Sequence, residues 1–177
     1  MRTISLKVKG AAVVLGTVVS IVAIPGAGVA APAGDEAGRR SAAVARISAN
    51  YADARPSGPD QIVFDGGQAG INFASRGFDD CLSGRVCFWD GRGFTGWMIW
   101  YGPESGITRR NFTDNGFNDL TSSWANRTAR DARWYYDSNQ SGTTRCMNAN
   151  HSTQWVGDSD NDEATSMAVF TDNQACS

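Results

Sequence analysis

One polar hexamer occurs twice in this 177-residue chain, and the repetition constrains the fold more than any other feature. The first copy is NDLTSS, residues 118–123, and the second is NDEATS, residues 161–166. Each copy follows a segment with two aromatic residues, an Asp, a turn and a Gly, namely FWDGRGFTG at 88–96 and YYDSNQSG at 135–142. A period of about forty residues indicates a duplicated supersecondary unit.

The region after Cys81 predicts an all-β fold. It holds all 6 Trp residues, and short aromatic or β-branched runs alternate there with Gly, Asn, Asp and Ser turns. The strand candidates are RVCFW, WMIWY, ARWYY, TTRCM and SMAVF. In WMIWY, positions 97, 99 and 101 share one face, and Met98 and Trp100 share the other. Four strands per repeat fit a Greek key, so we expect one at 81–126 and a second at 132–170, facing each other as one β-sandwich.

The N-terminus predicts a secretory signal peptide over residues 1–30. Basic residues between Arg2 and Lys9 precede an apolar run at 11–24, which Pro25 ends. That run is short for a membrane span, although an uncleaved signal anchor is the alternative. We therefore expect a secreted, extracellular protein.

Residues 31–60 have few bulky apolar side chains, so we expect a disordered linker or pro-segment there, with a short helix as the alternative around SAAVARISANYA. Residues 61–75 predict a hairpin with a Gly-rich turn at 65–67. An isolated hairpin is marginally stable, so this one should dock on the strands that follow. The domain is accordingly expected to span 61–177.

Four cysteines follow the signal segment: Cys81, Cys87, Cys146 and Cys176. An exported chain meets an oxidising compartment, so two disulfides are expected, and four cysteines allow three pairings. The short spacing with Gly84 between them favours a local Cys81–Cys87 loop, which leaves Cys146 with Cys176. Zinc is the alternative, but this spacing is long for a zinc site and no His stands near enough.

Charge and histidine content exclude several classes of function. Removal of residues 1–30 takes away three basic and no acidic residues, so the formal charge falls from −2 to −5. An acidic chain without a basic run is a poor binder of nucleic acid or membrane surfaces, and we expect a monomer without either partner. His151, the only histidine, lies in a polar loop without a nucleophile motif nearby, so we do not expect an enzyme.

The hexamers are rich in oxygen ligands. Calcium takes about six to eight oxygens at about 2.3–2.6 Å, more than one hexamer supplies. Two facing units could exchange ligands, each hexamer completing its site with carbonyls from the other unit's hairpin. The alternative is that these side chains cap tight turns. The hairpin aromatics Trp89, Phe94 and Tyr136 should pack the core, with a carbohydrate-binding platform as their alternative.

Several motifs together carry a family resemblance. WDGRGFTG, with Trp89, Phe94 and Gly96, resembles the βγ-crystallin hairpin, and both hexamers resemble the calcium motif of that superfamily. More narrowly, CLSGRVCFWDGRGFTG followed by NFTDNGFNDLTSSWANRT resembles the secreted actinobacterial peptidase inhibitors of inhibitor family thirty-six. The resemblance covers about 81–170 and, more loosely, the hairpin from Gln61. It implies a βγ-crystallin-like sandwich and inhibition of metalloproteinases.

The resemblance also implies two calcium sites. The first would use side-chain oxygens of Asn118 and Ser122 and the carbonyl of Leu120; the second would use Asn161, Thr165 and the carbonyl of Glu163. Carbonyls at 90–93 and 137–140 would complete the sites, and Asp119 and Asp162 would brace the loops. The second hairpin departs from the pattern, because Gln140 replaces the aromatic and the hairpin, counted from Asp137, is one residue shorter.

The expected function is therefore a secreted peptidase inhibitor, specific for metalloproteinases, on a calcium-binding scaffold. One alternative is a calcium-stabilised structural or stress module without a protease target, and another is a secreted toxin or wall-binding module of the same fold. The Cys81–Cys87 loop is a candidate for a rigid inhibitory loop but equally fits a brace for the first strand. No reactive bond is assigned.

Overall fold

The computed structural model describes residues 33–176, which belong to one compact unit of an 18-residue helix and eleven strands. The predicted signal peptide, residues 1–30, lies outside the described residues. No helix in the described part of the chain has the length and apolar character needed to cross a membrane.

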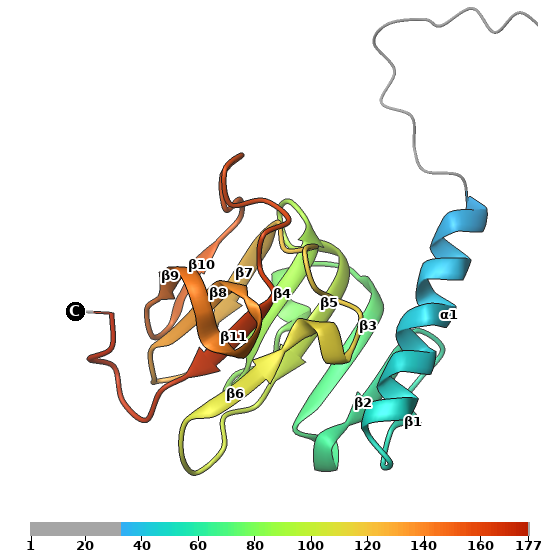
Figure 1. Cartoon of the computed structure of the whole chain (residues 1–177), viewed down its shortest axis with the longest axis horizontal. Coiled ribbons are helices and arrows are strands. Elements are labelled where there is room, and N and C mark those ends of the chain that lie inside the picture. The colour runs from blue at the N-terminus through green and yellow to red at the C-terminus, as the bar shows by residue number, and fades with distance from the viewer. Residues whose placement is uncertain (1–32, 177) are drawn as a thin grey trace, which may run out of the picture. The chain divides into compact units, whose positions relative to one another are not determined.

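The strands form two antiparallel sheets (Figure 1). The seven-stranded sheet has the order β1-β2-β3-β5-β4-β7-β10 and the four-stranded sheet the order β6-β11-β8-β9. In the first sheet the strands are β1 Arg55–Pro56, β2 Gln61–Phe64, β3 Ala69–Ser75, β4 Val86–Gly91, β5 Thr95–Tyr101, β7 Ser123–Asn126 and β10 His151–Thr153. In the second they are β6 Thr108–Asn111, β8 Ala132–Asp137, β9 Ser141–Met147 and β11 Ser166–Val169.

The two predicted Greek keys are present as β4–β7 and β8–β11. Each key gives its third strand to the other sheet, because β6 pairs with β11 and β10 pairs with β7. The quartet β5-β4-β7-β10 therefore has the same order as β9-β8-β11-β6, and the all-β, βγ-crystallin-like sandwich is confirmed. All five strand candidates are strands, whereas the short polar strands β6 and β10 carry no hydrophobic pattern and were not among them.

The hairpin at 61–75 docks as expected. Strand β2 pairs with β3, and β3 in turn pairs with β5, for example through Ile71 opposite Ile99. The hairpin thus widens the first sheet beyond the Greek-key strands, and Phe64 and Ile71 are fully buried there.

The expectation of disorder is wrong for the described residues 33–60, and a helix, the stated alternative, is present. Helix α1, Ala33–Asn50, lies beside β2 and β3 (Figure 1), and Ala43 and Ile47 are buried in the core. Tyr51 continues this stripe and its ring contacts that of Phe64, with centroids 4.5 Å apart. These residues recur every four positions, which is helical spacing, and their narrow stripe gains enough burial from the sheet to hold the helix. The compact unit accordingly begins near residue 32 rather than 61.

The predicted alternation in WMIWY is confirmed. Trp97, Ile99 and Tyr101 belong to the main core between the sheets, which α1 also joins. Met98 and Trp100 face the other side of the first sheet, where they pack with the disulfide-bonded cysteines of the 81–87 loop. Trp97, Met98 and Ile99 are each at most 1% exposed, so both faces of β5 are covered.

Both predicted disulfides are formed. Cys81 bonds to Cys87 with a Cα–Cα distance of 6.0 Å, and Cys146 bonds to Cys176 at 5.7 Å. The first closes a small loop ahead of β4. The second ties the C-terminal segment to β9, so the end of the chain is fixed to the smaller sheet.

Candidate functional site

The two hexamers lie against each other where they lead into β7 and β11. The N–H of Asp119 donates to the carbonyl of Ala164 at 3.0 Å, and the N–H of Asp162 donates to that of Thr121 at 3.1 Å. This reciprocal pair relates the two repeats as facing halves. The segments therefore run in opposite directions, and the start of one hexamer meets the end of the other.

The first oxygen cluster joins residues of both hexamers. The hydroxyl oxygen of Ser122 lies 2.6 Å from Oδ1 of Asn161 and 3.0 Å from the backbone carbonyl oxygen of Asp90. A serine hydroxyl has one hydrogen, so it can donate to only one of these two acceptors. Three oxygens that converge with one hydrogen among them are a ligand set that fits a hard cation.

The predicted calcium ligands are grouped differently from these contacts, and that grouping stays a prediction. Ser122 meets Asn161 of the other hexamer and not Asn118 of its own. We expected each hexamer to take carbonyl oxygens from the hairpin of the other repeat. Instead, the carbonyl of Asp90 comes from the hairpin of the same repeat as Ser122, and the amide of Asn161 comes from the other repeat. The physical reason is the antiparallel approach of the hexamers, which places position five of one beside position one of the other.

The second cluster contains a residue with another predicted role. The Thr165 hydroxyl donates to Oδ1 of Asp119 at 2.9 Å, so Asp119 is a candidate ligand as well as a brace. Asn118, predicted as a ligand, instead donates its amide to Oδ2 of Asp119 at 3.1 Å. Asp162 braces its loop as expected, since Asn161 Nδ2 donates to its Oδ2 at 2.6 Å.

Asp at the second position of each hexamer has a conformational role too. Asp119 has φ 55° and Asp162 has φ 62°, in the left-handed region that Asp tolerates better than most residues. This turn sets the direction of the chain at Leu120 and Glu163. The carbonyls of these two residues stay predicted ligands.

The last serine of each hexamer fastens it to its own hairpin. Ser123 donates its hydroxyl to the carbonyl of Gly91 at 2.7 Å and accepts the N–H of Phe94 at 3.1 Å. Ser166 donates to the carbonyl of Asp137 at 2.6 Å and accepts the N–H of Gln140 at 3.0 Å. These serines hold each hairpin against its hexamer, beside the oxygen clusters.

The two hairpins are the same length, which corrects the sequence alignment. The N–H of Ser122 donates to the carbonyl of Trp89, and the N–H of Thr165 donates to that of Tyr135. Tyr135 is thus the counterpart of Trp89, and the aromatic-to-Gln140 spacing equals the spacing in the first hairpin. Counting from Asp137 gave the wrong length because Asp137 corresponds to Gly91 and not to Asp90.

Two carboxylates near the clusters have perturbed pKa values. Burial raises the pKa of Asp90, although its Oδ2 pairs with Arg39 of α1 at 2.5 Å and its Oδ1 accepts the N–H of Trp97 at 2.7 Å. Burial also raises the pKa of Asp162, and the negative charge of Asp119 raises it further. A bound cation would favour the charged form of Asp162. Within residues 33–176, no group of three or more His, Cys, Asp or Glu side chains could hold a metal, so a cation at the clusters would depend on hydroxyl, amide and carbonyl oxygens.

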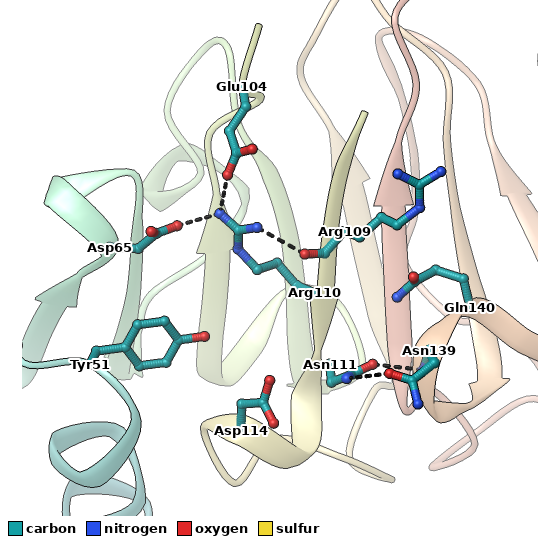
Figure 2. A pocket seen from close by; sticks show the side chains of 9 residues that line it. All are labelled: Tyr51, Asp65, Glu104, Arg109, Arg110, Asn111, Asp114, Asn139 and Gln140. Carbon is teal, nitrogen blue, oxygen red and sulfur yellow. Dashed lines mark hydrogen bonds and ion pairs between the residues drawn. The ribbon is translucent and has the colours of Figure 1, made fainter. Parts of the chain in front are cut away.

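A groove of about 360 Å³ opens beside the second hairpin (Figure 2). Tyr51 after α1, Asp65 in the β2–β3 turn and Asn139 in the second hairpin line it. Arg110 pairs with both Asp65 and Glu104, so it joins the N-terminal hairpin to the strand β6. Acidic and basic groups alternate along the groove, and its ion pairs hold the N-terminal region on the sandwich.

The remaining candidate residues lie apart from the clusters. His151 is exposed, and it begins β10 rather than lying in a loop as expected. Its Nδ1 lies 3.1 Å from the backbone oxygen of Ala149, which is not an acid–base partner. Leu82, in the loop closed by Cys81 and Cys87, is 53% exposed.

Comparison with known proteins found a family match in part of the chain. Residues 74–147 match the model of peptidase inhibitor family I36. The matched family is one of peptidase inhibitors, the class that the sequence motifs resemble. A comparison with curated proteins found no match.

Two solved structures are similar to parts of the chain. A βγ-crystallin domain from Clostridium beijerinckii is 21% identical, covers 49% of this chain and 97% of its own, and has a TM-score of 0.42. A βγ-crystallin domain from Flavobacterium johnsoniae is 20% identical, covers 52% of this chain and 98% of its own, and has a TM-score of 0.40.

Proposed function

Residues 74–147 carry the sequence signature of peptidase inhibitor family I36, and from that premise we propose that this chain is a secreted inhibitor of a metalloproteinase. The family match is the single observation that carries the proposal, and it supports the inhibitor class directly. The choice of a metalloproteinase as target follows from the motifs that resemble the secreted metalloproteinase inhibitors.

The rigidity of the fold supports an inhibitory role. Two disulfides close the 81–87 loop and fix the C-terminal segment. A surface that is already ordered loses little conformational entropy when it binds, so a rigid scaffold favours tight inhibition. Disulfides also persist in oxidising compartments, which supports action outside the cell.

We propose in addition that the two oxygen clusters bind calcium. Each cluster joins one hexamer to the other, through Ser122 with Asn161 and through Thr165 with Asp119. A cation that binds only the folded state stabilises it by mass action. Calcium would therefore lock the two Greek keys together, and the mostly neutral ligands would give a modest affinity.

The calcium proposal is tested with the double variant Ser122→Ala/Thr165→Ala. We expect calcium to raise the melting temperature of the wild-type chain and to leave that of the double variant unchanged, because each cluster loses its central hydroxyl. Differential scanning calorimetry with and without a chelator measures the rise, and Thr143→Ala at an exposed position of β9 is the control. A full calcium response in the double variant would show that the clusters are not the sites.

The inhibitor proposal is tested with a panel of purified proteases at a fixed calcium concentration, because chelation would disable a metalloprotease itself. The panel contains a thermolysin-like metalloprotease, a subtilisin-like serine protease and a papain-like enzyme. We expect stoichiometric inhibition of the metalloprotease. Inhibition of only the serine or cysteine enzyme would reject the metalloproteinase target, and inhibition of none would favour a calcium-stabilised module without a protease target.

A further inference from the structure

The loop closed by Cys81 and Cys87 carries an unusual side chain. Among residues 33–176, Leu82 is the one large hydrophobic residue whose side chain is exposed, at 53%. A single exposed leucine is ordinary in a soluble protein. What distinguishes this leucine is its position inside a disulfide-closed loop, directly after Cys81.

The loop holds Leu82 outward because its ends and its middle are fixed. Both cysteines are fully buried. The N–H of Gly84 donates to the carbonyl of Arg127 at 2.8 Å, and the N–H of Arg127 donates to that of Arg85 at 2.8 Å. The guanidinium of Arg127 also donates to the carbonyl of Cys81. Leu82 and Ser83 therefore project from a short segment that is anchored on both sides.

An apolar cluster lies directly under the loop, and Leu82 does not join it. Cys81, Cys87 and Trp100 pack there on the outer face of the first sheet, with Phe78 beside them. The guanidinium of Arg85 covers the Trp100 ring at 3.5 Å from its centroid. Burial of a leucine side chain would stabilise the fold. Leu82 stays exposed although the apolar cluster around Trp100 lies next to its loop.

A mostly polar hollow lies next to the loop that carries the exposed leucine. A hollow of about 240 Å³ beside the loop is lined by residues that include Ser83, Arg127 and His151. His151 belongs to β10, the end strand of the seven-stranded sheet. An apolar anchor next to a polar, partly hollowed rim is the usual anatomy of a protein contact surface.

We propose that Leu82 is the residue with which this chain enters an apolar substrate subsite of its target peptidase, while Ser83 and His151 form the rim of the contact. The inference rests on the proposed inhibitor function and adds the contact surface to it. Two observations favour a peptidase cleft as the occupant. The whole loop lies inside the region that matches the inhibitor family, residues 74–147, and its neighbours Ser83 and Gly84 are small enough to let a cleft close around Leu82.

The test compares full-length variants at position 82 against the peptidase that the wild-type chain inhibits best. Leu82→Asp should weaken inhibition at least about a hundredfold and Leu82→Ala about tenfold, since an anchor residue dominates an interface. Leu82→Met, of similar volume, should stay within about threefold. Thr143→Asp, which places the same charge on exposed β9, should inhibit like the wild type. Melting temperatures should not change, because the Leu82 side chain makes no core contact.

A competition experiment gives a second readout that does not depend on folding of a variant. A small leucine-based ligand of the peptidase active site should displace the wild-type chain. Simultaneous binding of both, or undiminished inhibition by Leu82→Asp, would overturn the assignment of Leu82 and leave the inhibitor function intact. Absence of inhibition by the wild-type chain across the protease panel would instead reject the proposed function, and the contact surface with it.

Discussion

The two hairpins share a backbone but differ in their surroundings. Phe94 in the first is 7% exposed, with ring centroids 5.1 Å from Trp89 and 5.3 Å from Phe78. Its counterpart Gln140 is half-buried and lines the groove of Figure 2. The duplicated backbone is therefore compatible with both a closed and an open environment, and the packing around each hairpin sets its stability.

The shared backbone has a local cause. Phe94 has φ 65° and Gln140 has φ 58°, so both adopt a left-handed conformation that a large side chain rarely takes. In each hairpin the N–H of this strained residue donates to the last serine of the hexamer, Ser123 or Ser166. The same hydrogen bond thus holds an unfavourable turn in both halves, whatever the side chain.

The largest expected difference in loss of stability between the two hairpins is that between Trp89→Ala and Tyr135→Ala. Trp89 is fully buried and donates its indole N–H to the Ser75 hydroxyl at 2.8 Å. Its truncation should lower the free energy of unfolding by about 3–5 kcal/mol. Tyr135 is half-buried, so its truncation should cost about 1–2 kcal/mol. Urea unfolding measures both, and equal losses would show that the halves are packed alike.

A smaller difference in loss of stability is expected between Gly96→Ala and Gly142→Ala. A Cβ at Gly96 would lie 2.0 Å from Oδ1 of Asp90, and one at Gly142 would lie 2.2 Å from Oδ2 of Asp137. Both glycines have positive φ, which costs an alanine about 1–2 kcal/mol. Arg39 fixes Asp90, whereas the exposed Asp137 can rotate away.

We therefore expect Gly142→Ala to show only that backbone cost and Gly96→Ala to reach about 3 kcal/mol. Thermal unfolding of the two variants checks the order. If Gly142→Ala were the more damaging change, the second hairpin would be the rigid one.

The smallest effect concerns the pH dependence of stability. Hydrogen bonds from Arg145, 2.7 Å away, lower the pKa of Asp160 in the second half. Its stabilising contribution is therefore present above the pKa of the unfolded chain and disappears as the pH falls through the folded pKa. Burial raises the pKa of Asp90 in the first half, so its contribution has the opposite sign and is lost as the pH rises.

Asp160→Asn should accordingly lower stability by less than about 1 kcal/mol near neutral pH. The difference from the wild type should shrink as the pH falls below the ordinary Asp pKa of about 3.9, and it should vanish only below the lowered pKa of the folded state. Urea unfolding over this pH range measures it. A difference that persisted in acid would mean that the charge of Asp160 is not what stabilises the second half.

The sequence contained most of the fold because its signals are local. The aromatic hairpins, the hexamers and the Gly84-containing cysteine loop each specify a turn or a strand pair within a few residues. The pairing of Ser122 with Asn161 could not be obtained this way, since it depends on the antiparallel approach of two distant segments. One signal was available in the sequence. Two repeats that face each other in opposite directions place position five of one hexamer beside position one of the other.

Helix α1 was predicted only as a short alternative around residues 41–52, for a different reason. Its buried residues are Ala43 and Ile47, with Val44 partly buried beside them and Tyr51 just after the end of the helix. This apolar stripe is too narrow to stand out in a segment rich in Ala, Arg and Gly. The energy that holds the helix comes from distant partners. Arg39 and Arg40 lie over the rings of Trp97 and Phe73, with distances of 3.9 and 4.7 Å to the centroids.

These distant partners impose an order on folding. The contacts of α1 reach 51 positions ahead to Asp90 and 67 positions ahead to Thr113. An isolated helix of this length is only marginally stable in water. The first element of the unit to be synthesised is therefore among the last to settle, after the strands that receive it have paired. A processing protease that cuts within residues 33–50 would meet an extended substrate before docking and a protected one afterwards, so timing alone can decide whether the segment is retained.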